Sequence, residues 1–212
     1  LNPNWNFDGS IYFGCREPHL PLELGYADAL LRQAGHETAL LDAALQGWDT
    51  VETRRRVADF QPDYTVIVTA PSYLFWRCPP PELRVPQQVA QTIHEVAGRL
   101  VVVGPHASTT PGATLRKLKA DIAVLGECEE VLVKLIEAGD AGRGDVTSIA
   151  YFDEGQLVVR GPRASADMER LPALRWPAEL VRRHHHHHHR FDGGSIGAGA
   201  EVEASRGCPY TC

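Results

Sequence analysis

The sequence has no long apolar run and few cysteines, and each absence excludes a class of protein. No stretch approaches the roughly 20 apolar residues that a transmembrane helix needs, and no signal-peptide pattern opens the chain. The five cysteines are odd in number and irregularly spaced, unlike the disulfide framework of a small secreted protein. We therefore expect no membrane partner and a location in the reducing cytoplasm.

Positive charge is also scarce. The chain carries 21 basic and 27 acidic residues, a net charge of -6, which argues against nucleic acid as a partner. The one counter-signal is a local basic run at Arg182, Arg183 and Arg190. What is present is ordinary for a globular protein: 212 residues, 43% of them hydrophobic, can form one full domain with an appendage.

Helical and strand patterns alternate over residues 1–144. Amphipathic patterns predict helices over residues 21–35, 50–60, 87–97, 111–119 and 127–138. Apolar runs, most of them rich in β-branched residues, predict strands over residues 36–42, 64–69, 100–103 and 121–125. This alternation predicts an α/β domain with a Rossmann-like (flavodoxin-like), doubly wound parallel sheet. The chain begins at Leu1 and not at Met, and we expect the first, central strand to precede Leu1 and both ends to be cut.

The pattern changes after Gly144. Residues 145–160 predict an appended β-hairpin, and residues 161–200, with scattered prolines, a linker. Residues 201–212 begin a second domain, with a first strand at 201–205. Six consecutive histidines lie at residues 184–189, inside the chain and not at a terminus, so we take them as native. They are either a solvated linker or a metal-binding or substrate-facing tract.

The loops that follow the predicted strands are where a ligand is expected, because open parallel sheets bind ligands outside the carboxyl ends of their strands. These loops are residues 3–20, 69–72, 104–108 and 126–129. Three of the four combine small residues with hydroxyl groups, which lets the backbone approach a large flat ligand closely.

The last seven residues, Arg206-Gly-Cys-Pro-Tyr-Thr-Cys212, carry the most specific motif. They resemble the start of the Cys-x3-Cys-x2-Cys loop of radical S-adenosylmethionine (SAM) enzymes. That resemblance implies that Cys208, Cys212 and a third cysteine beyond this sequence hold a [4Fe-4S] cluster, whose open iron binds SAM. The alternative is that Cys208 and Cys212 are incidental thiols that bind no cluster.

Four further motifs extend the resemblance over nearly the whole chain. They are Pro18-x-x-Pro21 running into Leu24-Gly-Tyr26, Ala34-Gly-His-Glu37, Gly104-Pro-His-Ala-Ser108 with Pro111, and Leu125-Gly-Glu127 with Glu129. Together they resemble the N-terminal cobalamin-binding domain of B12-dependent radical SAM enzymes, which leads into a radical SAM barrel. The family implies methylation or other remodelling of carbon, an electron donor such as flavodoxin or ferredoxin, and a small-molecule substrate. The opening loop and the histidine run look closest to a subgroup from oligosaccharide or natural-product gene neighbourhoods, so the substrate could be saccharide-like.

The resemblance implies a set of cobalamin-binding residues in the strand-end loops. They are Pro18, Leu20, Thr69, Ala70, Ser72, Gly104, Pro105, His106, Ser108, Gly126 and Glu127. The Asp-x-His-x-x-Gly motif that supplies a lower cobalt ligand in methionine-synthase-type domains is absent, because the matching region reads Asp42-Ala-Ala-Leu-Gln-Gly47. We therefore expect base-off cobalamin without a histidine ligand, with residues 74–76 as a possible cover for its lower face.

Other interpretations stay open at this point. The α/β domain could be a docking or substrate-recognition module that binds no cobalamin, whereas a nucleotide-binding domain is disfavoured because no Gly-x-Gly-x-x-Gly follows a strand. Glu127 and Glu129 also suit an acidic first turn that complements a helix dipole. Cys15, Cys78 and Cys128 suit small buried or loop residues, and Arg16 a surface residue or an anion partner. No residue is assigned a catalytic role, and we expect the chain alone to be inactive.

Overall fold

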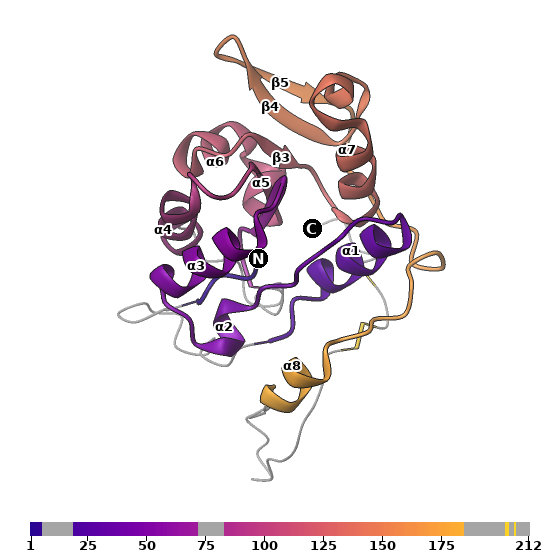
Figure 1. The fold of residues 1–212 in the computed structure, drawn as a ribbon. Helices are drawn as coiled ribbons and strands as arrows, with labels where there is room; N and C mark the ends of the chain where they lie inside the picture. Colours follow the sequence, from indigo (N-terminus) through magenta and orange to yellow (C-terminus); the bar gives the residue numbers. More distant parts are fainter. Residues whose placement is uncertain (6–18, 72–82, 185–201, 204–205, 207–212) are drawn as a thin grey trace, which may run out of the picture.

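Figure 1 shows the computed structural model of the chain, which describes residues 1–5, 19–71, 83–184, 202–203 and 206. The helices are α1 (Leu22–Gln33), α2 (Ala43–Gln46), α3 (Thr50–Phe60), α4 (Arg84–Ile93), α5 (Pro105–Thr109), α6 (Pro111–Leu118), α7 (Glu129–Gly142), the 3-10 helix η2 (Arg143–Asp145) and α8 (Ala178–Arg183). The strands are β1 (Tyr64–Val68), β2 (Arg99–Val103), β3 (Ile122–Val124), β4 (Ile149–Asp153) and β5 (Gln156–Arg160).

The five strands form one sheet in the order β1-β2-β3-β4-β5. The first three are parallel, with Val66 beside Val101 and Val101 beside Ile122. β4 joins β3 antiparallel, and β5 pairs with β4 through the tight turn at Glu154 and Gly155. The predicted α/β domain with an appended hairpin is therefore confirmed.

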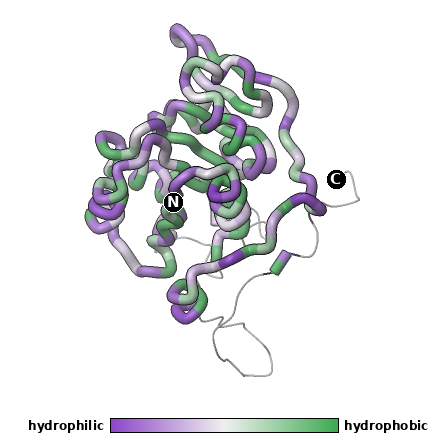
Figure 2. Tube along the Cα trace, turned by 45° about the vertical axis from the view of Figure 1, so that its right-hand side comes forward, coloured by the Kyte–Doolittle hydropathy of each residue, from purple (hydrophilic) through white to green (hydrophobic). Residues whose placement is uncertain are grey.

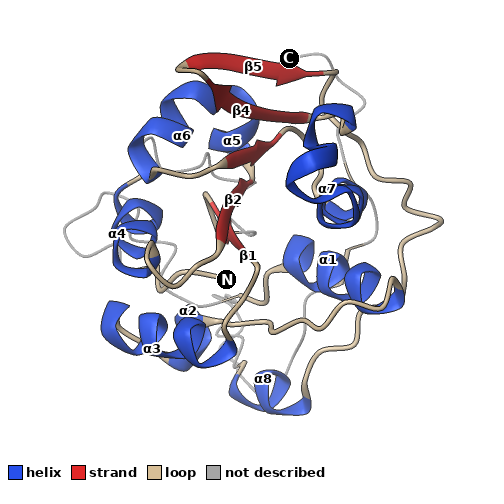
Figure 3. Cartoon of the chain, turned by 45° about the horizontal axis from the view of Figure 1, so that its top comes forward, coloured by secondary structure: helices blue, strands red, loops and turns tan. Residues whose placement is uncertain are grey.

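Helices cover both faces of the sheet (Figure 3). Leu100 and Val102 of β2 pack with α3, α4 and α6, whereas Val101 and Val103 pack with α1 and α7 on the other face. This follows from the alternation of side chains along a strand. It explains why the strand at residues 100–103 is apolar throughout, and Figure 2 shows the apolar segments gathered in the interior.

One predicted helix start and one predicted strand are wrong for local reasons. Helix α4 begins at Arg84 and not at 87, because Pro86 falls in its first turn, where the missing N–H costs nothing. The predicted strand at residues 36–42 does not form. Its one ladder contact is the parallel bridge between Asn2 and Asp42, since only Leu1 and Asn2 lie between this segment and β1.

The described part of the predicted linker packs on the domain. Ala164 forms a parallel bridge with Gly126, Leu174 and Trp176 lie against Gly25 of α1, and α8 contacts α2. The prediction of a linker missed α8 for lack of a sustained apolar period. Within the described ranges, no helix is long and apolar enough to cross a membrane.

Of the predicted strand at residues 201–205, Val202 and Glu203 have no strand structure and the others lie outside the described residues. Several other predictions also fall there: Pro18 and Ser72, residues 74–76, Cys15, Cys78, Arg16, Cys208, Cys212 and histidines 185–189.

Candidate functional site at the carboxyl edge of the sheet

The loops that follow β1, β2 and β3 are joined by hydrogen bonds at the carboxyl edge of the sheet. Both the amide and the hydroxyl of Thr69 donate to the Val103 carbonyl, each at 2.8 Å. The Ser108 hydroxyl donates to the Gly104 carbonyl at 2.9 Å and accepts from the Gly126 amide at 2.9 Å. Three of the four loops expected to bind a ligand therefore form one continuous edge.

Two glycines make this junction possible. Gly104 has φ +102° and Gly126 has φ +86°, a left-handed range that side chains rarely adopt. A Cβ atom at Gly104 would lie 2.9 Å from the Thr69 hydroxyl, and one at Gly126 would lie 2.2 Å from the Ala164 carbonyl oxygen. Glycine at these positions is thus required by close approach as well as by backbone geometry.

The predicted cobalamin residues differ in how they face this edge. Pro105 is exposed, and His106 and Ser108 are half-buried. Thr69, Ala70 and Leu20 are buried, so these three shape the edge from beneath. Pro18 and Ser72 lie outside the described residues.

Arg206 brings a buried charge cluster to the loop after β3. Its Nη1 lies 2.6 Å from Glu129 Oε1 and 3.8 Å from Glu127 Oε2, and its Nε donates to Glu203 Oε2 at 2.8 Å. The side chain of Glu129 is 0% exposed and that of Arg206 13%. The guanidinium also lies over the ring of Tyr26, 5.3 Å from its centroid.

The opposite charges of this cluster stabilise one another. Burial raises the pKa of Glu129 above its usual range, while the Arg206 charge opposes that shift. Burial acts to lower the pKa of Arg206, but Glu129 and Glu203 outweigh it and leave the pKa raised, so the guanidinium stays charged. Glu127 also accepts a hydrogen bond from the Ala166 amide, which ties residues 164–166 to the same loop.

Sequence reasoning missed this cluster. It interpreted Glu127 and Glu129 as an acidic first turn, and Glu129 does begin α7. The signal that could have revealed their partner is the Arg-Gly pair before Cys208, a charged residue in a segment expected to approach the strand-end loops.

Cys128 is a small core residue, as predicted. Its thiol is buried, and burial raises the pKa well above the usual range, so it is not poised to act as a thiolate ligand. In the described part of the chain, no three His, Cys, Asp or Glu side chains gather as a metal site. The predicted cluster ligands Cys208 and Cys212 are outside that part.

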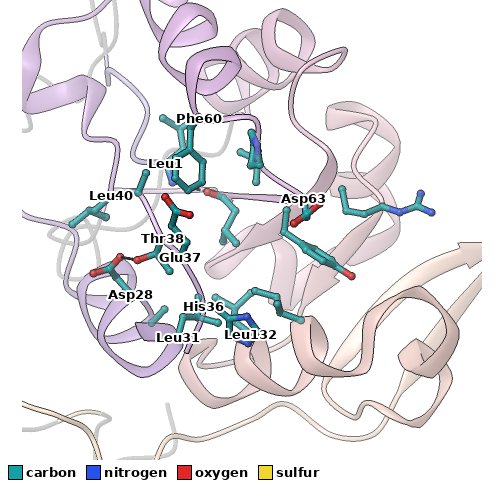
Figure 4. A pocket seen from close by; sticks show the side chains of 18 of the residues that line it. Leu1, Asp28, Leu31, His36, Glu37, Thr38, Leu40, Phe60, Asp63 and Leu132 are labelled. Carbon is teal, nitrogen blue, oxygen red and sulfur yellow. Dashed lines mark hydrogen bonds between the residues drawn. The ribbon is translucent and has the colours of Figure 1, made fainter. Parts of the chain in front are cut away.

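A groove of about 700 Å³ lies beside the amino ends of β1 and β2, and Figure 4 shows side chains that line it. Its walls include Leu31 of α1, Leu132 of α7, Tyr64 and Arg99. Of the predicted cobalamin residues that the structure describes, none lines this groove.

Asp42 ends the segment that follows α1 and forms a parallel bridge with Asn2. Burial raises the pKa of Asp42 to about 6. The Asp42 carboxylate accepts from the Leu45 amide at 2.9 Å and from Asn2 Nδ2 at 3.1 Å, so it caps α2 at the place where a cobalt-binding motif would begin.

Comparison with known proteins shows which fold this is. No protein-family model and no curated protein matches the chain. Among solved structures, radical S-adenosylmethionine methyltransferase TsrM from Kitasatospora setae, with cobalamin and a [4Fe-4S] cluster bound, matches at 20% identity and TM-score 0.59, covering 81% of this chain and 30% of that one. TsrM with tryptophan and a SAM analogue matches at 22% identity and TM-score 0.56, covering 68% and 28%.

A second enzyme of this kind has the same fold. Cobalamin-dependent S-adenosylmethionine radical enzyme OxsB, with aqua-cobalamin and S-adenosylmethionine bound, matches at 18% identity and TM-score 0.59 over 77% of this chain and 22% of that one. The chain therefore shares the fold of one region of cobalamin-dependent radical SAM enzymes and spans less than a third of their length.

Proposed function

We propose that this chain, which shares its fold with cobalamin-dependent radical SAM enzymes, is the cobalamin-binding portion of such an enzyme. The observation that carries the proposal is the continuous carboxyl edge made by the loops after β1, β2 and β3. In an open α/β sheet, this edge is where ligands bind. The likeness to TsrM and OxsB, whose structures hold cobalamin, supports cobalamin as that ligand.

The residues at this edge fit a large flat cofactor. Small residues at Gly104, Ser108 and Gly126 let the loops of this edge pack closely, and Pro105 and His106 form its outer rim. In the proposed site, these residues and Glu127 hold the corrin, and the buried Thr69, Ala70 and Leu20 support it from beneath. When bound, cobalamin would supply a transferable methyl group or related carbon chemistry.

The lower face of the cobalt is proposed to have no histidine ligand from this chain. Ala44 stands at the position of the histidine in the Asp-x-His-x-x-Gly motif, and Asp42 is committed to capping α2. The electron paramagnetic resonance spectrum of bound cob(II)alamin should then lack nitrogen splitting from an axial ligand. The spectrum of His94→Ala should match the wild type, and nitrogen splitting that is present in the wild type and lost in His106→Ala would contradict this assignment.

Cys208 and Cys212, with a third thiolate from the complete protein, are proposed to hold a [4Fe-4S] cluster that binds SAM. The cluster would supply one-electron chemistry, so a donor such as flavodoxin or ferredoxin is the expected partner. The proposed reaction is methylation or another modification of carbon in a small-molecule or saccharide-like substrate in the cytoplasm.

The test is cofactor binding by the complete protein, reconstituted anaerobically with iron, sulfide and hydroxocobalamin. We expect iron-sulfur absorbance and retained cobalamin after gel filtration. Pro105→Trp, on the exposed rim, should weaken cobalamin binding by roughly tenfold or more. Gln156→Trp, exposed on β5, is the matched control and should bind normally. An intact cluster without retained cobalamin would overturn the proposal and favour a docking module.

A further inference from the structure

We infer that Arg206 is a positioning residue: through Glu129 it fixes the start of the cluster loop to the edge proposed to bind cobalamin. The inference rests on the proposed function and adds to it a specific link between the two cofactor sites. Arg206 lies two residues before Cys208 in the chain, yet its partners Glu127 and Glu129 belong to the loop and helix after β3.

The contacts of residue 206 require a planar group with donors on several sides, which arginine has and lysine lacks. Nη1 pairs with Glu129 and approaches Glu127, Nε donates to Glu203, and the planar face lies over Tyr26. These contacts need donors on different sides of one planar group. The fully buried carboxylate of Glu129 can be paired by Arg206 only when residue 206 lies at this place, so the pairing specifies one position for the chain.

Stability alone does not account for a buried pair of this kind. The desolvation of two charges offsets much of their attraction, and well-packed apolar side chains commonly serve as well. A buried ion pair does penalise every arrangement that separates its members, because each would leave an unpaired charge in the interior. Arg206 and Glu129 therefore act on where the cluster loop begins more than on whether the domain folds.

The link continues from Arg206 to the proposed corrin edge through contiguous contacts. Glu127, which approaches Arg206, follows Gly126, and the Gly126 amide donates to the Ser108 hydroxyl. Ser108 in turn donates to the Gly104 carbonyl. The same loop holds the linker, through the Ala164 amide to Leu125 and the Ala166 amide to Glu127. A shift at residue 206 is thus resisted by the edge itself.

The first experiment measures backbone hydrogen exchange on the 212-residue chain without cofactors. Arg206→Gln should raise exchange at residues 126–129 and 203–206 by roughly tenfold or more. The control is Arg99→Gln, which removes an exposed arginine paired with Asp140 and Asp121 at the other edge, and it should leave both segments unchanged. Unchanged exchange in Arg206→Gln would overturn the inference.

A double variant separates position from folding. Arg206→Met with Glu129→Leu removes both charges and keeps the buried volume apolar, so thermal unfolding should stay near that of the wild type. Exchange at residues 203–206 should nevertheless remain high, because the pairing that specifies their place is gone. If exchange at residues 203–206 in this variant equals that of the wild type, the ion pair does not determine the position of these residues, and the inference is overturned.

The second experiment uses the complete reconstituted protein and measures the magnetic interaction between the reduced cluster and cob(II)alamin. Arg206→Gln should keep its iron and cobalamin and lose the wild-type interaction, and Arg206→Lys should retain part of it. An unchanged interaction would overturn the inference while the proposed function stands. If the wild type binds no cobalamin, the proposed function fails, and hydrogen exchange alone decides the role of Arg206.

Discussion

The carboxyl and amino edges of the sheet differ in the contacts that cover them. At the carboxyl edge, segments far apart in sequence converge on the loop after β3, and the ion pair between Arg206 and Glu129 is buried. At the amino edge, Arg99 pairs with Asp140 in the open, with 45% of its side chain exposed, beside a groove of about 700 Å³. This groove thus lies away from the carboxyl edge, where open α/β sheets bind ligands.

The contrast also concerns two buried carboxylates. Burial raises the pKa of both Glu129 and Asp42, but Glu129 faces the guanidinium of Arg206, whereas Asp42 is held by hydrogen bonds from the Leu45 amide and the Asn2 side chain. Stability should therefore depend on pH through Asp42. Three changes, from the largest expected effect to the smallest, test these contrasts.

Gly126→Ala should be the most damaging substitution. A Cβ atom there would meet Ala164 backbone atoms at 2.2 and 2.7 Å, at a φ of +86°, so we expect a loss of about 3 kcal/mol or more in unfolding free energy. Gly35→Ala is the matched change beside the groove, with φ +90° and no atom within 4 Å, and should cost about 1 kcal/mol. Equal losses in urea unfolding would remove the distinction between the two edges.

Asp42 should make stability depend on pH. Its pKa is about 6 when folded and 3.8 in its ordinary state, so the folded chain binds more protons and stability falls as the pH rises between these values. Asp42→Asn keeps an acceptor for the Leu45 amide and removes the charge. Relative to wild type, the variant should gain roughly 2 to 3 kcal/mol between pH 4 and pH 7. A constant offset would contradict the assigned burial cost.

Arg99→Gln should have the smallest effect. Its pairs with Asp140 and Asp121 are exposed, and exposed pairs contribute less than about 1 kcal/mol. We expect a loss below that limit in urea unfolding, and a smaller one at high salt. A loss comparable to that of Gly126→Ala would mean that exposed ion pairs at the amino edge contribute as much stability as close backbone packing at the carboxyl edge.

Much of the fold could be predicted from the sequence, because apolar periodicity reports which residues face a core. The helix over residues 50–60 and the strands near 64–69 and 100–103 form where this signal is strong. The segment 36–42 has strand-like residues but no adjacent strand along most of its length, and strand structure depends on such a partner.

The strand-end loops of the candidate site could also be predicted, because topology places them at one edge. The pairing of Arg206 with Glu129 could not, since it joins polar residues that are distant in sequence and follow no period. The contact of Trp176 with Gly25 has the same character: a single large residue in a proline-rich segment does not indicate which helix it will meet.

These contacts between residues distant in sequence also determine the order in which the chain can complete its packing. Tyr26 lies on the first helix and meets Arg206, the last described residue, and Gly25 meets Trp176. Closing such long loops is slow, because the chain must lose the entropy of everything between before the contact forms. During synthesis, α1 emerges before these partners, so its contacts with Trp176 and Arg206 can form only after those residues have been added to the chain.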